Sequence, residues 1–174
     1  IFFFYNYLRF GNIFQTGYDY IHESSNLEQI RKKNGISSFK NIPQNARYMF
    51  FELPKVEFVR NNLVFNFNLY GNSIFFLTPP FLTIFLAPIL RRKGGIQINH
   101  FIASLWIAVF ATTIPILMHY SSGWMQFGYR YSLDITVLLL LLSVFGMKGK
   151  RNLLYVAGTL FAMAFYIAGI TKLM

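Results

Sequence analysis

The sequence contains no cysteine and few acidic residues. The absence of cysteine excludes disulfide bonds, thiolate metal sites and cysteine nucleophiles, and it leaves the redox compartment undetermined. Only 6 of the 174 residues are Asp or Glu, and the 3 histidines are scattered along the chain. Neither an HExxH pattern nor a glycine-rich phosphate loop is present. We therefore expect no metal site and no cofactor in these residues, and no motif of a soluble enzyme stands out.

The composition is that of a membrane protein. Hydrophobic residues make up 55% of the chain and aromatic residues 20%, and the mean hydropathy is +0.41. Charged residues make up only 13%, whereas a soluble domain has about 25%. The formal net charge of +10 comes largely from short basic runs between apolar segments, which does not fit a nucleic-acid-binding face. We expect membrane lipids as partners and no nucleic acid.

Residues 74–174 contain four apolar stretches, at about 74–90, 98–118, 131–147 and 153–170. A helix rises about 1.5 Å per residue, so stretches of this length approach the roughly 30 Å of a bilayer's hydrocarbon core. Prolines within them are tolerated in membrane helices, because neighbouring groups satisfy the freed carbonyls. The predicted fold class is an all-α polytopic membrane protein with about four transmembrane helices.

Residues 1–73 are mixed in character and are predicted to form an outward-facing segment with short juxtamembrane helices. A short helix is expected from Leu27 to Lys33, because Asn34 and Gly35 would stop it. A second is expected from Pro43 to Leu53, lying in the membrane interface on its apolar side or packing on the membrane helices. Residues 64–69 are expected to form a short strand or an extended approach to the next segment.

The first residues, Ile1 to Tyr5, resemble the last turn of an apolar helix whose beginning is missing. No charged region precedes a short apolar one, so the sequence contains no recognisable signal peptide. The expectation is a C-terminal part of a longer protein.

The short loops predict an orientation. The loops 91–97 and 148–152 carry Arg91-Arg92-Lys93 and Lys148-Gly149-Lys150-Arg151, whereas the intervening loop carries only Arg130. Basic short loops face the cytoplasm. We therefore expect a multi-pass protein of the plasma (inner) membrane with residues 1–73 and 124–134 outside.

The most promising stretch for chemistry runs from Ser122 to Asp134, directly before a leucine-rich run. Arg130 and Asp134 are spaced as i,i+4 neighbours on a helix, and Asp134 would lie in the first turn, where the helix dipole favours a carboxylate. Ionisable groups at a membrane boundary are functional candidates. The alternative is structural: Arg130 extends to the lipid headgroups and Asp134 neutralises it and caps the helix. A weaker candidate is the loop group of Asp19, His22 and Glu23, since such side chains are usually only solvated.

Two motifs carry a resemblance to a known family. The first is an aromatic helix end leading into Tyr5-Asn6-Tyr7-Leu8-Arg9-Phe10-Gly11-Asn12 and Gly17-Tyr18. The second is Trp124-x-Gln126-Phe127-Gly128-Tyr129-Arg130-Tyr131-x-Leu133-Asp134. Together they resemble the C-terminal half of multi-spanning membrane glycosyltransferases of the GT-C class, such as the protein O-mannosyltransferases and the lipid A aminoarabinose transferase. Val137 stands near a position where a proline is expected in that class.

The resemblance implies an enzyme that transfers a sugar from a polyprenyl-phosphate donor to a lipid, glycan or protein acceptor on the outer membrane face. In that class the catalytic acidic residue lies in the first outward loop, so no catalytic residue is assigned here. The implied donor site has Arg130 binding the phosphate, with Asp134 holding the guanidinium. The other expected contacts are phosphate or sugar hydrogen bonds from Gln126 and Tyr129, and lipid or sugar contacts from Trp124, Phe127 and Tyr131.

Two other classes of function remain open from the sequence. A transporter of a lipid-linked sugar would also use broken helices and a charged pair, but it should contain internal repeats and binding groups at the bilayer midplane. A non-catalytic membrane scaffold subunit needs only packing surfaces. The small residues of the last apolar stretch, such as Ala157 and Gly158, suit close helix contacts.

Overall fold

The computed structural model describes residues 1–15, 17, 20, 24–59, 62–87, 96–123, 126–147 and 153–173. The chain forms two compact units, residues 1–35 and 36–174. The first unit contains α1 (Phe2–Phe10) and α2 (Ser25–Asn34). α2 has Glu28 in its first turn and three basic residues in its last turn, which complements the helix dipole. Because α2 ends at Asn34, followed by Gly35 at a φ of 78°, the predicted short helix and its stop are confirmed.

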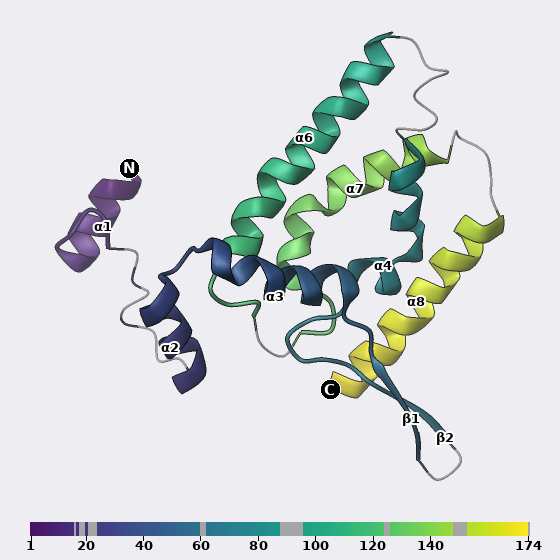
Figure 1. The fold of residues 1–174 in the computed structure, drawn as a ribbon, viewed down its shortest axis with the longest axis horizontal. Helices are drawn as coiled ribbons and strands as arrows, with labels where there is room; N and C mark the ends of the chain where they lie inside the picture. The colour runs from purple at the N-terminus through teal and green to yellow at the C-terminus, as the bar shows by residue number, and fades with distance from the viewer. Residues whose placement is uncertain are drawn as a thin grey trace. The chain divides into compact units, whose positions relative to one another are not determined.

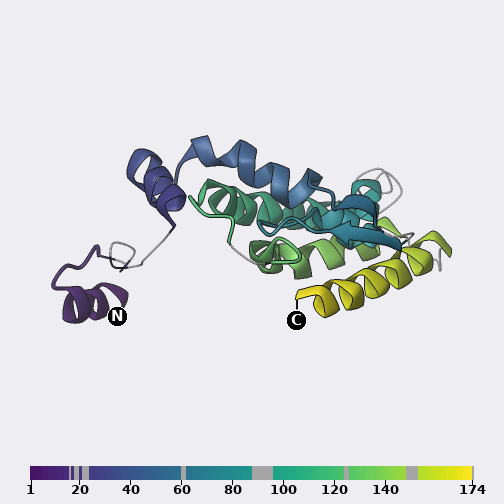
Figure 2. The ribbon, with the colours of Figure 1, turned by 90° about the horizontal axis from the view of Figure 1, so that it is seen from below.

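The second unit is built from helical segments and one hairpin. In chain order they are η2 (Phe39–Asn41), α3 (Ile42–Ala46), η3 (Arg47–Phe51), β1 (Lys55–Val59), β2 (Asn62–Asn66), α4 (Ile74–Leu77), η4 (Pro79–Leu86), α6 (Ile96–Met118), η6 (Arg130–Ser132), α7 (Leu133–Gly146) and α8 (Leu153–Leu173). α6 and α7 pack side by side, with α3 against α6 and η4 between α7 and α8 (Figures 1 and 2). The described segments between residues 36 and 73 therefore belong to the same packed unit as the long helices.

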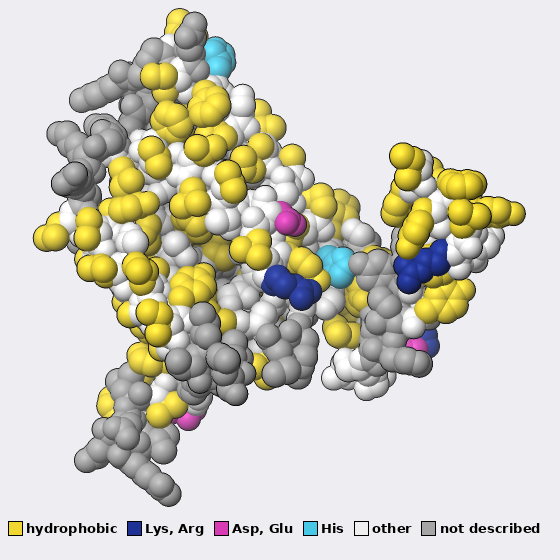
Figure 3. All heavy atoms as spheres, turned by 180° about the vertical axis from the view of Figure 1, so that it is seen from behind, with side chains coloured by type: hydrophobic (Ala, Val, Ile, Leu, Met, Phe, Trp, Pro, Cys, Tyr) yellow, Lys and Arg dark blue, Asp and Glu magenta, His cyan; other side chains and the backbone are white. Residues whose placement is uncertain are grey.

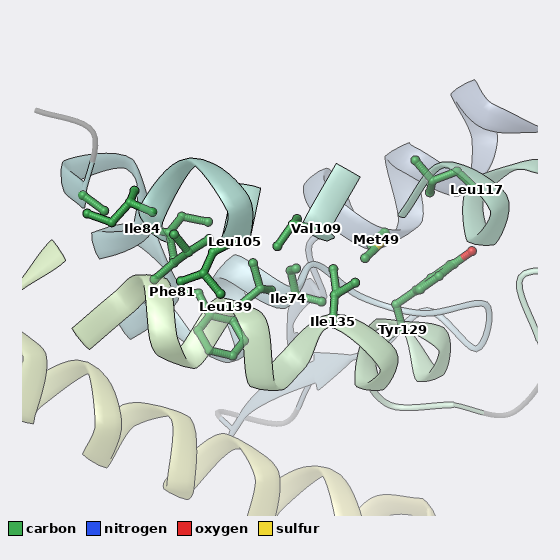
Figure 4. Packing of buried hydrophobic residues seen from close by; sticks show 13 residues of the cluster. Met49, Ile74, Phe81, Ile84, Leu105, Val109, Leu117, Tyr129, Ile135 and Leu139 are labelled. Atoms are coloured by element: carbon green, nitrogen blue, oxygen red, sulfur yellow. The ribbon is translucent and has the colours of Figure 1, made fainter. Parts of the chain in front are cut away.

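The core of this unit lies between α6, α7 and η4 (Figure 4). Ile84, Leu139 and Leu142 are at most 2% exposed. Burying such a side chain contributes roughly 1.5–3 kcal/mol. Met49 brings η3 into the same cluster with no exposed surface at all. The apolar side predicted for residues 43–53 thus packs on the long helices.

Two asparagines fix α3 to the end of α6. The Asn45 side chain donates hydrogen bonds to the carbonyl oxygens of Leu117 at 2.9 Å and His119 at 2.7 Å, and Asn41 donates to that of Met118 at 3.0 Å. Carbonyls in the last turn of a helix have no partner within the helix. These side chains satisfy them and hold residues 36–46 at this end of α6.

The prediction of about four transmembrane helices is wrong. Among the described residues, only Ile98–Met118 within α6 is long and apolar enough to cross a membrane. Pro79 and Pro80 interrupt the stretch at 74–90, so α4 ends at Leu77 and a 3-10 segment follows. α7 has 14 residues, or about 21 Å, because residues 130–132 form a separate 3-10 turn. In α8, the apolar stretch that falls within the described residues is Tyr155–Gly169.

The expectation of an all-α fold is also wrong, because β1 and β2 form an antiparallel hairpin. Val56 lies opposite Phe65, and Phe58 opposite Leu63. The Phe65 ring packs edge-on against Phe165 of α8, with ring centroids 5.0 Å apart. The predicted strand or extended segment at 64–69 is the end of β2 and the loop after it. Its partner strand, β1, was not predicted.

Candidate anion-binding site before α7

The connection between α6 and α7 is fixed by the side chain of Gln126, which is 9% exposed. Its Nε2 donates to the carbonyl oxygens of Tyr70 at 2.5 Å and Ser122 at 2.6 Å, and its Oε1 accepts from the backbone N–H of Arg130 at 3.0 Å. Both ends of the amide are engaged by backbone groups. The predicted hydrogen bond of Gln126 to a donor phosphate or sugar stays a prediction, and its observed role is to position Arg130.

A second amide, that of Asn72, holds the loop before α4 against the same connection. Asn72 is fully buried, and its Nδ2 donates to the carbonyl oxygen of Phe127 at 2.7 Å. Gly71 has a φ of 122°, and a Cβ there would lie 3.1 Å from the Tyr129 ring. Glycine is therefore needed at this turn for both its backbone and the close approach. Asn72 was not predicted as a site residue from the sequence, although asparagine is enriched in such turns.

Arg130 is exposed and lies just before the first turn of α7. Its guanidinium carbon is 5.3 Å from the centre of the Tyr131 ring, a cation–π contact. The His119 ring lies 5.7 Å from the same ring, so an imidazole, a phenol ring and a guanidinium form one cluster. Charged side chains are sparse among the hydrophobic ones on the face of the molecule that Figure 3 shows.

Asp134 lies in the first turn of α7 and is exposed, as predicted. Within the described residues, however, neither Arg130 nor Asp134 forms an ion pair. The predicted role of Asp134 in holding the guanidinium has no contact to support it. The Tyr131 ring and the Gln126 side chain contact Arg130 instead, and no acid among the described residues neutralises its positive charge.

Tyr129 is only 1% exposed, and its hydroxyl has no hydrogen-bond partner among the residues that the structure describes. The ring belongs to the hydrophobic core, where Figure 4 shows it beside Leu117. Burial, and to a smaller extent Tyr131, raises the pKa of this phenol well above its usual range. The hydroxyl is thus neutral and enclosed, so a direct phosphate contact would require the core to open.

The remaining predicted contacts fall in different places. Phe127 is 9% exposed and packs against Phe67, with ring centroids 4.4 Å apart, and against Tyr166. It faces protein in this arrangement. Trp124 lies outside the described residues, as do Asp19, His22 and Glu23. In the described part of the chain, no group of three His, Asp or Glu side chains could hold a metal.

Sequence reasoning missed a second polar cluster, centred on Glu52. Its carboxylate accepts hydrogen bonds from Arg47 Nε and Asn68 Nδ2, each at 2.9 Å. η3 is a π-turn in which the N–H of Glu52 donates to the carbonyl oxygen of Arg47 at 2.8 Å. A spacing of five residues does not pair side chains on an α-helix. No sequence signal could therefore have linked Arg47 and Glu52.

A groove lies between α4, η4 and α8, with a volume of about 620 Å³. Apolar side chains line it almost entirely: Leu53, Ser73, Phe75, Phe76, Pro79, Leu82, Ala157, Gly158 and Phe161. Gly158 allows the close approach, since a Cβ there would lie 3.3 Å from Pro80. Such a lining suits a hydrocarbon chain.

No family model, curated protein or solved structure matches the chain. The resemblance to the GT-C glycosyltransferases stays a prediction, and function rests on the geometry.

Proposed function

We propose that the chain is part of a membrane glycosyltransferase that takes a sugar from a polyprenyl-phosphate donor and transfers it to a lipid, glycan or protein acceptor. In this proposal the described residues bind the donor, and Arg130 binds its phosphate. No residue of the chain is assigned as the catalytic acid or base.

The observation that carries the proposal is the guanidinium of Arg130, which lies before the N-terminus of α7 and has no ion-pair partner in the described part of the chain. An arginine gives a phosphate charge-assisted, bidentate hydrogen bonds. The start of a helix adds a positive field to the same place. Gln126 bonds to the backbone N–H of Arg130, and the Tyr131 ring contacts its guanidinium. Because Arg130 is held in this way before a ligand arrives, less conformational entropy is lost on binding.

Two further features support a lipid-linked ligand. Only 28% of the most apolar part of the candidate span, Ile98–Met118, is buried in protein, and the rest is an apolar surface that can face lipid. The groove beside α8 has the lining that a prenyl chain requires. The proposal includes a location in the plasma (inner) membrane, with the basic loop 91–97 in the cytoplasm.

The test is donor binding and sugar transfer by the complete gene product in nanodiscs, with a radiolabelled polyprenyl-phosphate sugar. Arg130→Ala should weaken donor binding by about tenfold or more, the effect of losing one charge-assisted contact. Arg130→Lys should restore only part of the affinity, because a lysine cannot bind a phosphate bidentately. Asp134→Asn should strengthen binding, because it removes a negative charge next to the phosphate.

Lys40→Ala is the matched control, because it removes an exposed positive charge from η2. Equal losses in Lys40→Ala and Arg130→Ala would indicate a general charge effect and contradict a phosphate site. If the wild type transfers sugar and Arg130→Ala does so equally well, the enzyme proposal stands and the site is wrong. If no donor is bound or consumed, the glycosyltransferase proposal fails and a scaffold role takes its place.

A further inference from the structure

We propose that the cluster of Arg47, Tyr48, Glu52, Asn68 and Tyr70 binds an uncharged carbohydrate ring. This cluster, named here the Glu52 cluster, is separate from the cation at Arg130. It deepens the proposed function, on which its role as the acceptor subsite rests, but the binding chemistry stands by itself.

The charge balance of the Glu52 cluster excludes a phosphate ligand. Arg47 Nε lies 2.9 Å from Glu52 Oε2, so the positive charge is neutralised within the cluster. A carboxylate at this distance would repel an anion. Arg130, by contrast, has no acid bonded to it among the residues described. The two arginines therefore differ in the ligand that they favour: an anion at Arg130 and a neutral group at Arg47.

The cluster still offers hydrogen bonds to a neutral ligand. The Arg47 side chain is 70% exposed, and its terminal nitrogens make no hydrogen bond in the described part of the chain. The Glu52 side chain is 13% exposed, and its two oxygens accept one hydrogen bond each, from Arg47 and Asn68, so each keeps a further lone pair. Adjacent donors and acceptors of this kind match the vicinal hydroxyl groups of a sugar.

An aromatic platform lies beside these polar groups. The rings of Tyr48 and Tyr70 stack, with centroids 5.7 Å apart and planes at 22°. Tyr70 is 37% exposed, and its backbone N–H donates to Asn68 Oδ1 at 3.0 Å, which links the platform to Asn68. The face of an aromatic ring is electronegative and attracts polarised C–H groups such as those of a pyranose.

The local backbone is built to keep the cluster in place. The π-turn η3 brings Arg47 and Glu52 together, and π-turns are frequent at functional sites. The backbone N–H of Ser73 donates to the carbonyl oxygen of Glu52 at 2.8 Å. Gln126 bonds to the carbonyl oxygen of Tyr70 and to the N–H of Arg130. One side chain therefore connects the neutral cluster to the cationic site, as an acceptor subsite beside a donor phosphate requires.

The test is saturation-transfer NMR on the complete gene product in detergent micelles, with methyl α-D-mannopyranoside and methyl β-D-glucopyranoside as probes. Glu52→Gln should reduce the saturation transfer at least fivefold, because a donor nitrogen replaces one of the two oxygens that accept from Arg47 and Asn68. Tyr70→Leu should cause a similar loss through the platform and tests the site independently if Glu52→Gln does not fold. The matched control is Glu57→Gln, because Glu57 is an exposed acid on β1.

Loss of the signal in Glu52→Gln and Tyr70→Leu, with Glu57→Gln unchanged, supports the proposal. Equal signals in all variants, or no signal from the wild type with either probe, overturn it. Competition by inorganic phosphate at the Glu52 cluster would overturn it as well. Arg130→Ala should keep the glycoside signal while losing the polyprenyl-phosphate donor. If glycosides bind and no donor does, the glycosyltransferase proposal fails while the carbohydrate site stands.

Discussion

Single amide side chains determine the shape of the candidate site. Gln126 satisfies three backbone groups from three segments, and Asn72 joins Phe127 to the loop before α4. A buried amide of this kind is costly to remove, because each released backbone group loses a partner in a place that water does not reach. These residues fix where Arg130 and the Glu52 cluster lie, although neither amide is itself free to bind a ligand.

Tyr129 allows a residue-scale test that depends on pH. Burial raises its pKa in the folded state, whereas an unfolded tyrosine ionises near pH 10. Above about pH 10 the unfolded chain therefore releases a proton that the folded chain retains, and stability falls as pH rises. Tyr129→Phe should remove this part of the alkaline loss. At pH 8 the variant should be as stable as the wild type or more stable by about 1 kcal/mol, because the hydroxyl has no partner to lose.

The measurement for Tyr129 is the free energy of unfolding in detergent at pH 8 and pH 11. The other tyrosines contribute equally to both proteins, so the difference between them isolates Tyr129. Tyr7→Phe is the control, since Tyr7 is 56% exposed. A Tyr129→Phe variant that loses as much stability between the two pH values as the wild type would show that this phenol is accessible to water.

The sequence allowed some site residues to be predicted and not others. Arg130 and Asp134 were identifiable because charges beside an apolar run are conspicuous, and both are exposed near the start of α7. Their predicted pairing was not formed, because Arg130 lies in a 3-10 turn and not in the helix itself. The roles of Glu52 and Gln126 depend on partners 16 and 56 residues away, and no local pattern specifies such contacts.

At the scale of elements, packing of α7 on η4 depends on Gly146. A Cβ built at Gly146 would lie 2.0 Å from the carbonyl oxygen of Thr83. The adjacent Thr83 hydroxyl donates to Ser143 Oγ at 3.1 Å, so the two segments are in contact over a turn of α7. Helix propensity alone favours alanine over glycine by about 1 kcal/mol. The close approach of the Thr83 backbone to Gly146 opposes this preference for alanine.

Gly146→Ala should therefore destabilise the protein by about 1–3 kcal/mol, the usual cost of overpacking. Chemical denaturation in detergent micelles measures the change. Gly158→Ala is the comparison and should cost less, because its Cβ would meet side-chain atoms alone, those of Pro80 at 3.3 Å and Pro79 at 3.4 Å. If Gly146→Ala instead stabilises the protein by the propensity difference, α7 and η4 do not approach as closely as described.

The positions of helices were predicted more successfully from the sequence than the lengths of those helices. Apolar periodicity and capping residues identified α2 and the segment from Pro43 onward, because these signals are local. The number of membrane spans was overestimated, because hydropathy does not show that Pro79 and Pro80 convert a helix into a 3-10 segment. β1 was missed because a two-stranded hairpin depends on its partner and on packing against α8.

At the scale of the second unit, polar side chains concentrate at one end of α6. The Asn41 and Asn45 contacts, the Gln126 connection and Arg130 all lie near Met118 or the start of α7. The sequence before Ile96, at the other end of the helix, contains Arg91-Arg92-Lys93. If α6 crosses the membrane, the basic run is on the cytoplasmic side and the polar end is outside.

The natural absence of cysteine makes this orientation directly testable. In right-side-out vesicles, a membrane-impermeant maleimide should label Lys40→Cys, an exposed position in η2, which packs on the end of α6. It should label Ile96→Cys, 76% exposed at the start of α6, only after the vesicles are permeabilised. The unmodified protein is the control, because it has no thiol to react. Labelling of both positions in intact vesicles would show that α6 does not cross the membrane. Both ends of α6, and the Arg130 site with them, would then lie on the same side of the membrane.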